Sequence, residues 1–214
     1  MRKTIGISCI TLGLVCLLAA VGIVVYNRYE ENAGTQSSQT LLQDVQLRIE
    51  ENASAPTDAP APPTPTENEN TPELLPEPTV PSMLTVPVDG GECLGILSIP
   101  VLELELPVLA DWSYEKLKKA PCHYYGSYYE TDFVIAAHNF QSHFGRLSEL
   151  QAGDVVIFTD VNGTAHCYEV VLLETLPKEA TLEMITSGFD LSLYTCTPGG
   201  GSRVTVRCKS IRLS

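Results

Sequence analysis

The chain has 214 residues and a formal net charge of −13, with 26 acidic and 13 basic side chains. A chain of this length folds as one or two domains. It carries no basic stripe that would neutralise phosphates, which excludes a nucleic-acid-binding protein. The charge is unevenly distributed, at +2 over residues 1–26, −9 over residues 27–90 and −6 over residues 91–214, so these three segments differ in character.

The first segment is expected to cross a membrane. Ile5 to Tyr26 is an apolar, uncharged run of 22 residues, which as a helix would extend about 33 Å and cross a bilayer core. Arg2 and Lys3 precede this run, so the positive-inside rule predicts a cytoplasmic N-terminus and an extracellular remainder. A cleaved signal peptide is the alternative, but its apolar region is usually only about 7–15 residues long. We therefore expect residues 1–26 to be an uncleaved signal anchor.

Residues 27–90 are expected to form a disordered, acidic stalk rich in proline and threonine. Ten of the fifteen prolines lie between Pro56 and Pro87, and such a segment buries too little apolar surface to offset the entropy cost of ordering. A short amphipathic helix is predicted within the stalk, although isolated helices of that length are marginal in water. Its apolar face would consist of Leu41, Leu42, Val45 and Ile49. The expected role of the stalk is to carry the folded head away from the membrane.

Residues 91–214 are predicted to form a folded, all-β head. Short apolar runs separated by turn signals are typical of a closed antiparallel β architecture. The expected strands are 95–99, 102–109, 132–137, 155–159, 165–173, 191–196 and 204–213. A helix is predicted from Ser113 to Lys119, with Ser113 as its N-cap, and a second, shorter helix from Phe144 to Leu150.

Cys196 and Arg203 are the first candidate site residues. Residues 191–196 and 203–207 alternate as strands do, and Pro198 with three glycines breaks the structure between them. A short connection would bring the thiol beside the guanidinium, which favours the thiolate and offers donors to an oxyanion. Arg207 is the alternative arginine, but it would lie about 13 Å farther along the strand. We expect Arg207 to be a surface charge.

His138 is the third candidate, because it ends the apolar strand that begins at Phe133 and precedes a polar loop. A cysteine, a histidine and an arginine at strand ends form a constellation suited to acyl transfer. His143 is the rival histidine, which we expect either to line a substrate groove or to face solvent.

These residues and their spacing resemble the sortases, the membrane-anchored cysteine transpeptidases of Gram-positive bacteria. The resemblance covers about Gly91 to Leu213, with Ser192 standing where the family usually has threonine. The motifs that carry it are Leu94-Gly-Ile-Leu-Ser-Ile-Pro100, Ile135-Ala-Ala-His-Asn139, Phe144-x-x-Leu-x-x-Leu-x-x-Gly-Asp154, Leu191-Ser-Leu-Tyr-Thr-Cys196 and Arg203-Val-Thr-Val206. The segment 174–190 is too short for the helical insertion of class B sortases, so the subclass stays open.

The resemblance implies a closed eight-stranded β-barrel with short helices and a two-stage reaction. Cys196 would be the nucleophile that attacks a Leu-Pro-x-Thr-Gly-like (LPXTG-like) sorting signal, His138 the acid/base and Arg203 the residue that stabilises the oxyanion and positions substrate. The thioester would then pass to an amine of a cell-wall precursor or a pilin subunit. Two alternatives remain: a cysteine hydrolase, and a non-catalytic, membrane-tethered β binding domain in which Cys196 only packs.

No cofactor and no catalytic metal are expected. His123 and His166 have no second ligand at metal spacing. Because the sortase family includes calcium-stimulated members, an activating Ca²⁺ is the one alternative, with ligands from Glu103, Glu105, Asp160 and Glu169. The head also contains four further cysteines, expected to be mostly buried thiols, although three disulfide pairings are open to them: Cys93, Cys122, Cys167 and Cys208.

Overall fold

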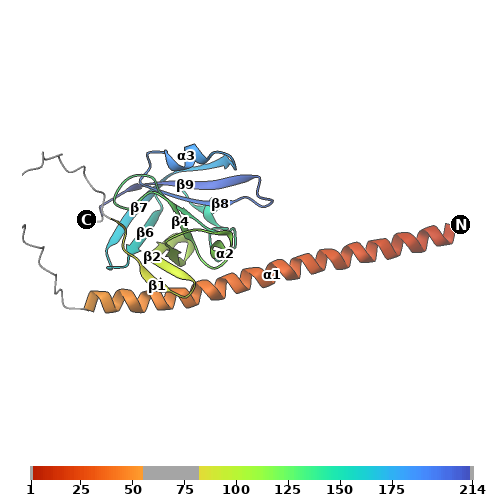
Figure 1. The fold of residues 1–214 in the computed structure, drawn as a ribbon. Coiled ribbons are helices and arrows are strands. Elements are labelled where there is room, and N and C mark those ends of the chain that lie inside the picture. The colour runs from red at the N-terminus through yellow and green to blue at the C-terminus, as the bar shows by residue number, and fades with distance from the viewer. Residues whose placement is uncertain (1, 55–81, 213–214) are drawn as a thin grey trace, which may run out of the picture.

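A long helix lies against a closed β-barrel in the computed structural model, which describes residues 2–54 and 82–212 (Figure 1). Helix α1 (Arg2–Ser54) has 53 residues, which corresponds to a length of about 80 Å. Most of the proline-rich stretch falls on residues 55–81, which lie outside the described residues. The barrel follows from residue 86 onward.

Eight strands close the barrel. The sheet order is β1-β2-β3-β4-β5-β8-β9-β7-β6, and β2 also pairs with β6, so the ring from β2 round to β6 is closed and β1 is attached outside it as a hairpin. This confirms the expected all-β, eight-stranded barrel. The strands are β1 (Val86–Val88), β2 (Gly91–Ile99), β3 (Leu104–Leu109), β4 (Cys122–Tyr125), β5 (Phe133–Ala136), β6 (Val155–Asp160), β7 (Ala165–Pro177), β8 (Leu191–Cys196) and β9 (Ser202–Ser210).

The sheet is mixed, whereas the strand pattern predicted an antiparallel one. Strands β3 and β4 pair in parallel, and so do β5 and β8. A parallel pair requires a long crossover between its strands, and residues 137–190, which contain β6 and β7, provide one between β5 and β8. Because β5 and β8 run in the same direction, their carboxyl ends meet at the same edge of the barrel.

The barrel interior is filled with large apolar side chains. Phe133, Phe158 and Leu193 are fully buried there, together with the Cys208 thiol that the alternation of β9 directs inward. The ring closes tightly between β2 and β6, where a Cβ at Gly95 would collide with the carbonyl of Thr159. Burial of this order supplies most of the free energy that holds a small domain together.

Short helical turns connect the strands. Helix α2 (Tyr114–Leu117) begins as predicted, with Ser113 Oγ accepting a hydrogen bond of 3.2 Å from the backbone N–H of Lys116, although it ends two residues earlier than expected. The predicted helix at 144–150 contains only the 3₁₀ turn η2 (Leu147–Glu149). The sequence pattern did not indicate η1 (Pro100–Leu102) or α3 (Thr181–Ile185), which has no side-chain N-cap.

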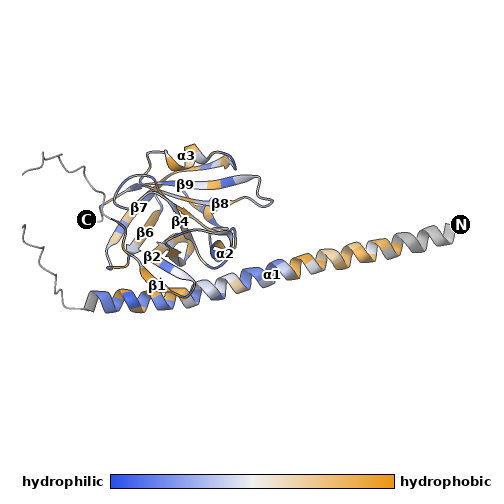
Figure 2. Ribbon diagram, in the orientation of Figure 1, coloured by the Kyte–Doolittle hydropathy of each residue, from blue (hydrophilic) through white to orange (hydrophobic). Residues whose placement is uncertain are grey.

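Helix α1 has two parts of different character, as Figure 2 shows by hydropathy. Its first part carries exposed apolar side chains such as Leu12 and Val24, and α1 is long and apolar enough to cross a membrane. The second part, residues 27–54, lies along the barrel (Figure 1), where Leu41 and Val45 are buried against β1, β2 and β3.

Residues 27–54 therefore differ from the expected disordered stalk. The predicted apolar face is present, since Leu42 and Ile49 also pack on the barrel beside Val45. Contact with the barrel stabilises a helix that would be marginal alone. This part of the chain thus lies against the head and does not hold it away from the membrane.

Candidate active site

The hairpin of β8 and β9 brings Cys196 opposite Arg203. The two residues are partners in the antiparallel register. The turn between them is closed by two backbone hydrogen bonds, from Thr197 N–H to the Ser202 carbonyl at 3.0 Å and from Gly200 N–H to the Thr197 carbonyl at 2.8 Å. Gly199 and Gly200 have φ of 86° and 73°, a conformation that glycine adopts at little cost. The predicted strand–turn–strand is confirmed.

The parallel pairing of β5 and β8 brings His138 to the same edge. Ala136 is the register partner of Tyr194, and each strand reaches its candidate residue two positions later, at His138 and Cys196. The pairing extends beyond β5, because Ala137 N–H donates to the Tyr194 carbonyl at 3.2 Å. Neighbouring strands lie about 4.8 Å apart. Three adjacent strands therefore deliver a histidine, a cysteine and an arginine to one edge of the barrel.

The imidazole of His138 is held by its two following neighbours. Its Nδ1 lies 2.9 Å from Asn139 Oδ1, and its ring stacks on Phe140 with centroids 4.2 Å apart and an angle of 16° between the planes. An amide oxygen can only accept, so Nδ1 carries the proton of this bond. The neutral ring then presents an unprotonated Nε2, which is free to exchange a proton.

His143, the rival histidine, neither lines a groove nor faces solvent. Its side chain is fully buried beside the Phe140 ring, at 5.4 Å between centroids. Burial, followed by the charge on His138, lowers the pKa of His143 to about 4. It is therefore a neutral packing residue at physiological pH. The sequence missed this because the loop folds back on itself, with Gly145 N–H donating to the Phe140 carbonyl.

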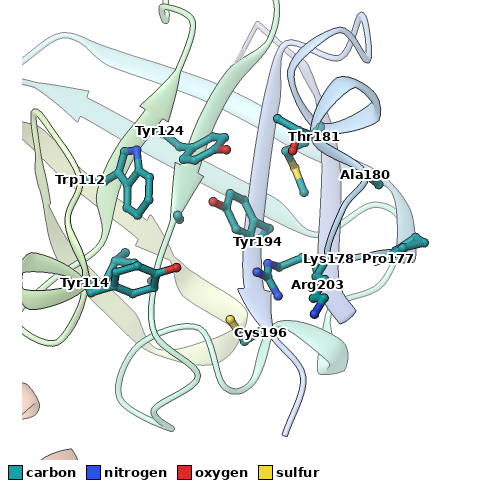
Figure 3. A pocket seen from close by; sticks show the side chains of 14 residues that line it. Trp112, Tyr114, Tyr124, Pro177, Lys178, Ala180, Thr181, Tyr194, Cys196 and Arg203 are labelled. Carbon is teal, nitrogen blue, oxygen red and sulfur yellow. The ribbon is translucent and has the colours of Figure 1, made fainter. Parts of the chain in front are cut away.

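A pocket of about 180 Å³ opens beside Cys196 and Arg203 (Figure 3). The Cys196 side chain is exposed at its rim. One wall of the pocket is aromatic, and the opposite wall is the connection from β7 to β8, including Lys178 and Thr181. The aromatic wall consists of Trp112, Tyr114, Tyr124 and Tyr194.

Edge-to-face contacts join the rings of the aromatic wall in pairs. The rings of Tyr124 and Tyr194 are 5.4 Å apart at 85°, and those of Trp112 and Tyr114 are 5.7 Å apart at 81°, in the geometry that aromatic pairs prefer. Burial raises the pKa of Tyr194, so its hydroxyl stays protonated. Sequence reasoning missed this wall because it did not identify β4. The only signal was the cluster of tyrosines at 124, 125, 128 and 129.

Arg207 is buried, with 1% of its surface exposed, and is not the expected surface charge. Its guanidinium pairs with Glu174 at 2.8 Å and donates to Ser192 Oγ at 2.9 Å. It also donates to the backbone carbonyls of Glu183 at 2.6 Å and Met184 at 3.3 Å. Arg207 therefore fastens α3 to the barrel. Alternation along β9 correctly predicted that Arg207 lies on the outer face of the strand. The connection between β7 and β8 covers that face and buries the side chain.

The acidic residues considered as calcium ligands do not come together in the part of the chain that the structure describes. Within residues 2–54 and 82–212, no three His, Cys, Asp or Glu side chains converge on a point. Asp160 instead accepts hydrogen bonds from two backbone N–H groups of its own turn and pairs with His166 at 3.2 Å. The four further cysteines of the head are free thiols, and three of them are buried: Cys93, Cys122 and Cys208.

Comparison with known proteins identifies the family of the chain. A family model described as the sortase domain matches residues 97–211. Sortase D of Bacillus subtilis (strain 168) is 30% identical over 114 residues, which cover 51% of this chain and 57% of that protein. The chain thus spans little more than half the length of this relative.

Solved structures show the same fold. Sortase A from Corynebacterium diphtheriae superposes with a TM-score of 0.51 at 23% identity, covering 57% of this chain and 62% of that one. The pilus-related sortase C of Group B Streptococcus superposes with a TM-score of 0.50 at 26% identity, covering 56% and 68%. Since the family model matches more than half of the residues, the chain belongs to the sortase family, whose members are cysteine transpeptidases.

Proposed function

We propose that this chain is an active transpeptidase in which Cys196 is the nucleophile, His138 the acid/base and Arg203 the oxyanion donor. One observation carries the proposal: Cys196 and Arg203 are register partners, and His138 follows the end of the neighbouring parallel strand β5 by two residues. The exposed thiol beside a preformed pocket supports the same roles.

The first stage cleaves a peptide bond. The Cys196 thiolate attacks the threonine carbonyl carbon of an LPXTG-like sorting signal, so a C–S bond forms and the carbonyl electron pair moves to oxygen. The Arg203 guanidinium donates hydrogen bonds to this oxyanion, which preorganised donors stabilise strongly. His138 as imidazolium gives its Nε2 proton to the leaving amine. The C–N bond then breaks and leaves a thioester on Cys196.

The second stage joins the acyl group to an amine. Neutral His138 accepts a proton from the incoming amine, the new C–N bond forms, and Cys196 leaves as a thiolate. The amine belongs to a peptidoglycan precursor or to a lysine of a pilin subunit, and the acyl group to a surface protein that bears the sorting signal. Neither stage requires a cofactor.

The proposed location is the cell membrane, with the N-terminus inside and the barrel outside. The apolar first part of α1 and the basic residues Arg2 and Lys3 support this orientation. Protease added to intact cells should then cleave within residues 55–81. Full protection of the chain in intact cells would contradict the orientation.

The test uses the full chain in lipid vesicles and a library of fluorogenic peptides. We expect cleavage of LPXTG-like peptides by the wild type and none by Cys196→Ala, with Cys208→Ala as the control for loss of a thiol. Addition of oligoglycine, diaminopimelate or a lysine peptide should yield a ligated product. Cleavage without ligation would identify a cysteine hydrolase. If no peptide in the library were cleaved, a non-catalytic binding domain would be the better description.

A further inference from the structure

Helix α1 contacts the loop that carries His138, just beyond the apolar run. This loop, residues 138–144 (the His138 loop), lies between β5 and β6. Glu31 Oε1 accepts a 2.9 Å hydrogen bond from the backbone N–H of Gln141. The hydroxyls of Thr35 and Ser142 are hydrogen-bonded at 2.7 Å. Glu31 and Thr35, four positions apart, lie on one face of α1.

Gly34 allows the helix to approach this closely. A Cβ at Gly34 would lie 2.8 Å from Cε2 of the Phe140 ring and 2.7 Å from the backbone carbonyl oxygen of Lys118. Neither distance is compatible with a real side chain, so a larger residue at position 34 would displace Phe140, the helix or both. An ion pair between Glu30 and Lys118 at 3.5 Å lies beside this contact.

Phe140 connects the contact to the imidazole. One end of its ring packs on Gly34, and its face stacks on His138 at 4.2 Å. The buried side chain of His143 lies behind Phe140, so the ring has little room to move. A displacement of Phe140 is therefore transmitted to the ring of His138.

We propose that Glu31, Gly34 and Thr35 of α1 are positioning residues for His138, so that the barrel reaches full activity only with this part of the helix docked. The inference rests on the proposed role of His138 as acid/base. Its physical basis is that proton transfer requires the imidazole within about 0.5 Å of its productive place, and the His138 loop is not part of a strand. Glu31 lies five residues beyond Tyr26, about 7.5 Å along the helix, so the membrane anchor and the histidine are directly coupled.

Two pairs of variants of the full chain in lipid vesicles test this. Glu31→Ala removes the acceptor for Gln141, and Asn32→Ala is its control, because Asn32 is exposed on the same turn. Gly34→Ala adds a Cβ against Phe140, and Gly22→Ala is its control, because a Cβ there meets nothing within 4 Å. Glu31→Gln keeps an acceptor oxygen and should rescue the first defect.

The measurements are hydrogen exchange in the His138 loop, residues 138–144, and steady-state peptide cleavage. Glu31→Ala and Gly34→Ala should exchange faster in this loop, and kcat should fall about 10- to 100-fold, the effect of an ångström-scale displacement. KM and the melting temperature should change little, because the pocket and the barrel core are not altered. Both controls should match the wild type.

Each contrary outcome has a distinct meaning. Unchanged exchange in Glu31→Ala and Gly34→Ala would show that α1 does not hold the loop, which overturns the inference. Faster exchange with wild-type kcat would show that the contact does not position His138, which also overturns it. If the wild type itself cleaved no peptide, the proposed function would fail, and the exchange result would still decide whether α1 holds the loop.

Discussion

Cys196 and Arg203 face each other across the ladder of β8 and β9, immediately before and after a glycine turn. Because both residues belong to strands, the ladder fixes their spacing more firmly than a loop would. His138 reaches the same edge from β5, but on a loop whose geometry depends on Phe140 and α1. The candidate site therefore combines a rigid thiol–guanidinium pair with a histidine that is positioned separately.

Arg203→Lys should lower kcat by about 10²–10³, the usual loss when one oxyanion donor is removed. A lysine ammonium cannot direct two donors in the planar geometry of a guanidinium. The melting temperature should change little, because Arg203 is only half-buried and donates hydrogen bonds to the nearby carbonyls of Gly200 and Ser202. Peptide cleavage and thermal melting of the same preparation measure both effects. A kcat within a few-fold of the wild type would remove Arg203 from the proposed mechanism.

Arg207→Lys should have the opposite effect to Arg203→Lys: it should lower the stability of the barrel more than it lowers kcat. The shorter side chain loses hydrogen bonds to the Glu183 and Met184 carbonyls, and each bond to a charged group is worth about 1.5–3 kcal/mol. The expected signature is a lower melting temperature, with KM raised more than kcat is lowered, because α3 lines the pocket beside Cys196. An unchanged melting temperature would contradict the assigned role of Arg207.

Cys196 should react with iodoacetamide at pH 7.5 at least about tenfold faster than the buried thiols. Burial raises the pKa of Cys93 to about 11 and of Cys122 and Cys208 to about 12, so these thiols stay protonated and enclosed. The Cys196 side chain is exposed. Mass spectrometry of peptides after timed labelling gives the individual rates. Equal labelling of Cys208 and Cys196 would mean that the barrel core is open.

Acid should destabilise the barrel through His143. Its pKa in the folded state is about 4, below the ordinary 6.5. The unfolded chain therefore binds a proton between these values while the folded chain does not, and the free energy of unfolding falls as pH falls from 6.5 to 4. The difference between these two pKa values corresponds to a loss of about 3 kcal/mol in the free energy of unfolding. Urea unfolding followed by Trp112, the single tryptophan of the chain, measures the loss.

The matched variant is His143→Phe, which cannot titrate. Its stability should depend less steeply on pH over the same interval, whatever its absolute stability at pH 7. Parallel curves for the wild type and His143→Phe would show that His143 is not the group responsible.

The barrel should stay on the membrane after its covalent link to α1 is cut. A protease recognition site inserted between residues 55 and 81 allows cleavage in vesicles. The buried contacts of Leu41 and Val45 with the barrel should then keep it in the vesicle pellet. Val45→Asp should release it, because an unpaired charge in that apolar contact costs several kcal/mol. Release of the barrel without this substitution would show that residues 27–54 hold it only weakly.

The sequence alone determined the features that depend on local pattern. Alternation along residues 191–196 gave β8 with its bounds as the structure has them, and the glycines after Pro198 indicated the turn that brings Arg203 back to Cys196. The uncharged run from Ile5 to Tyr26 likewise indicated an apolar helix. These features follow from neighbouring residues, whose periodicity records which face is buried.

Only the tertiary structure decided which distant segments meet. The parallel pairing of β5 with β8 sets His138 beside Cys196, and the folded loop buries His143. The connection that contains α3 covers Arg207, which alternation alone left as a surface charge. The sequence predicted a disordered stalk for residues 27–54, because a lone amphipathic helix is marginal in water. The barrel supplies the apolar surface that stabilises this helix. Burial and strand partners depend on contacts far apart in the chain, which local periodicity does not record.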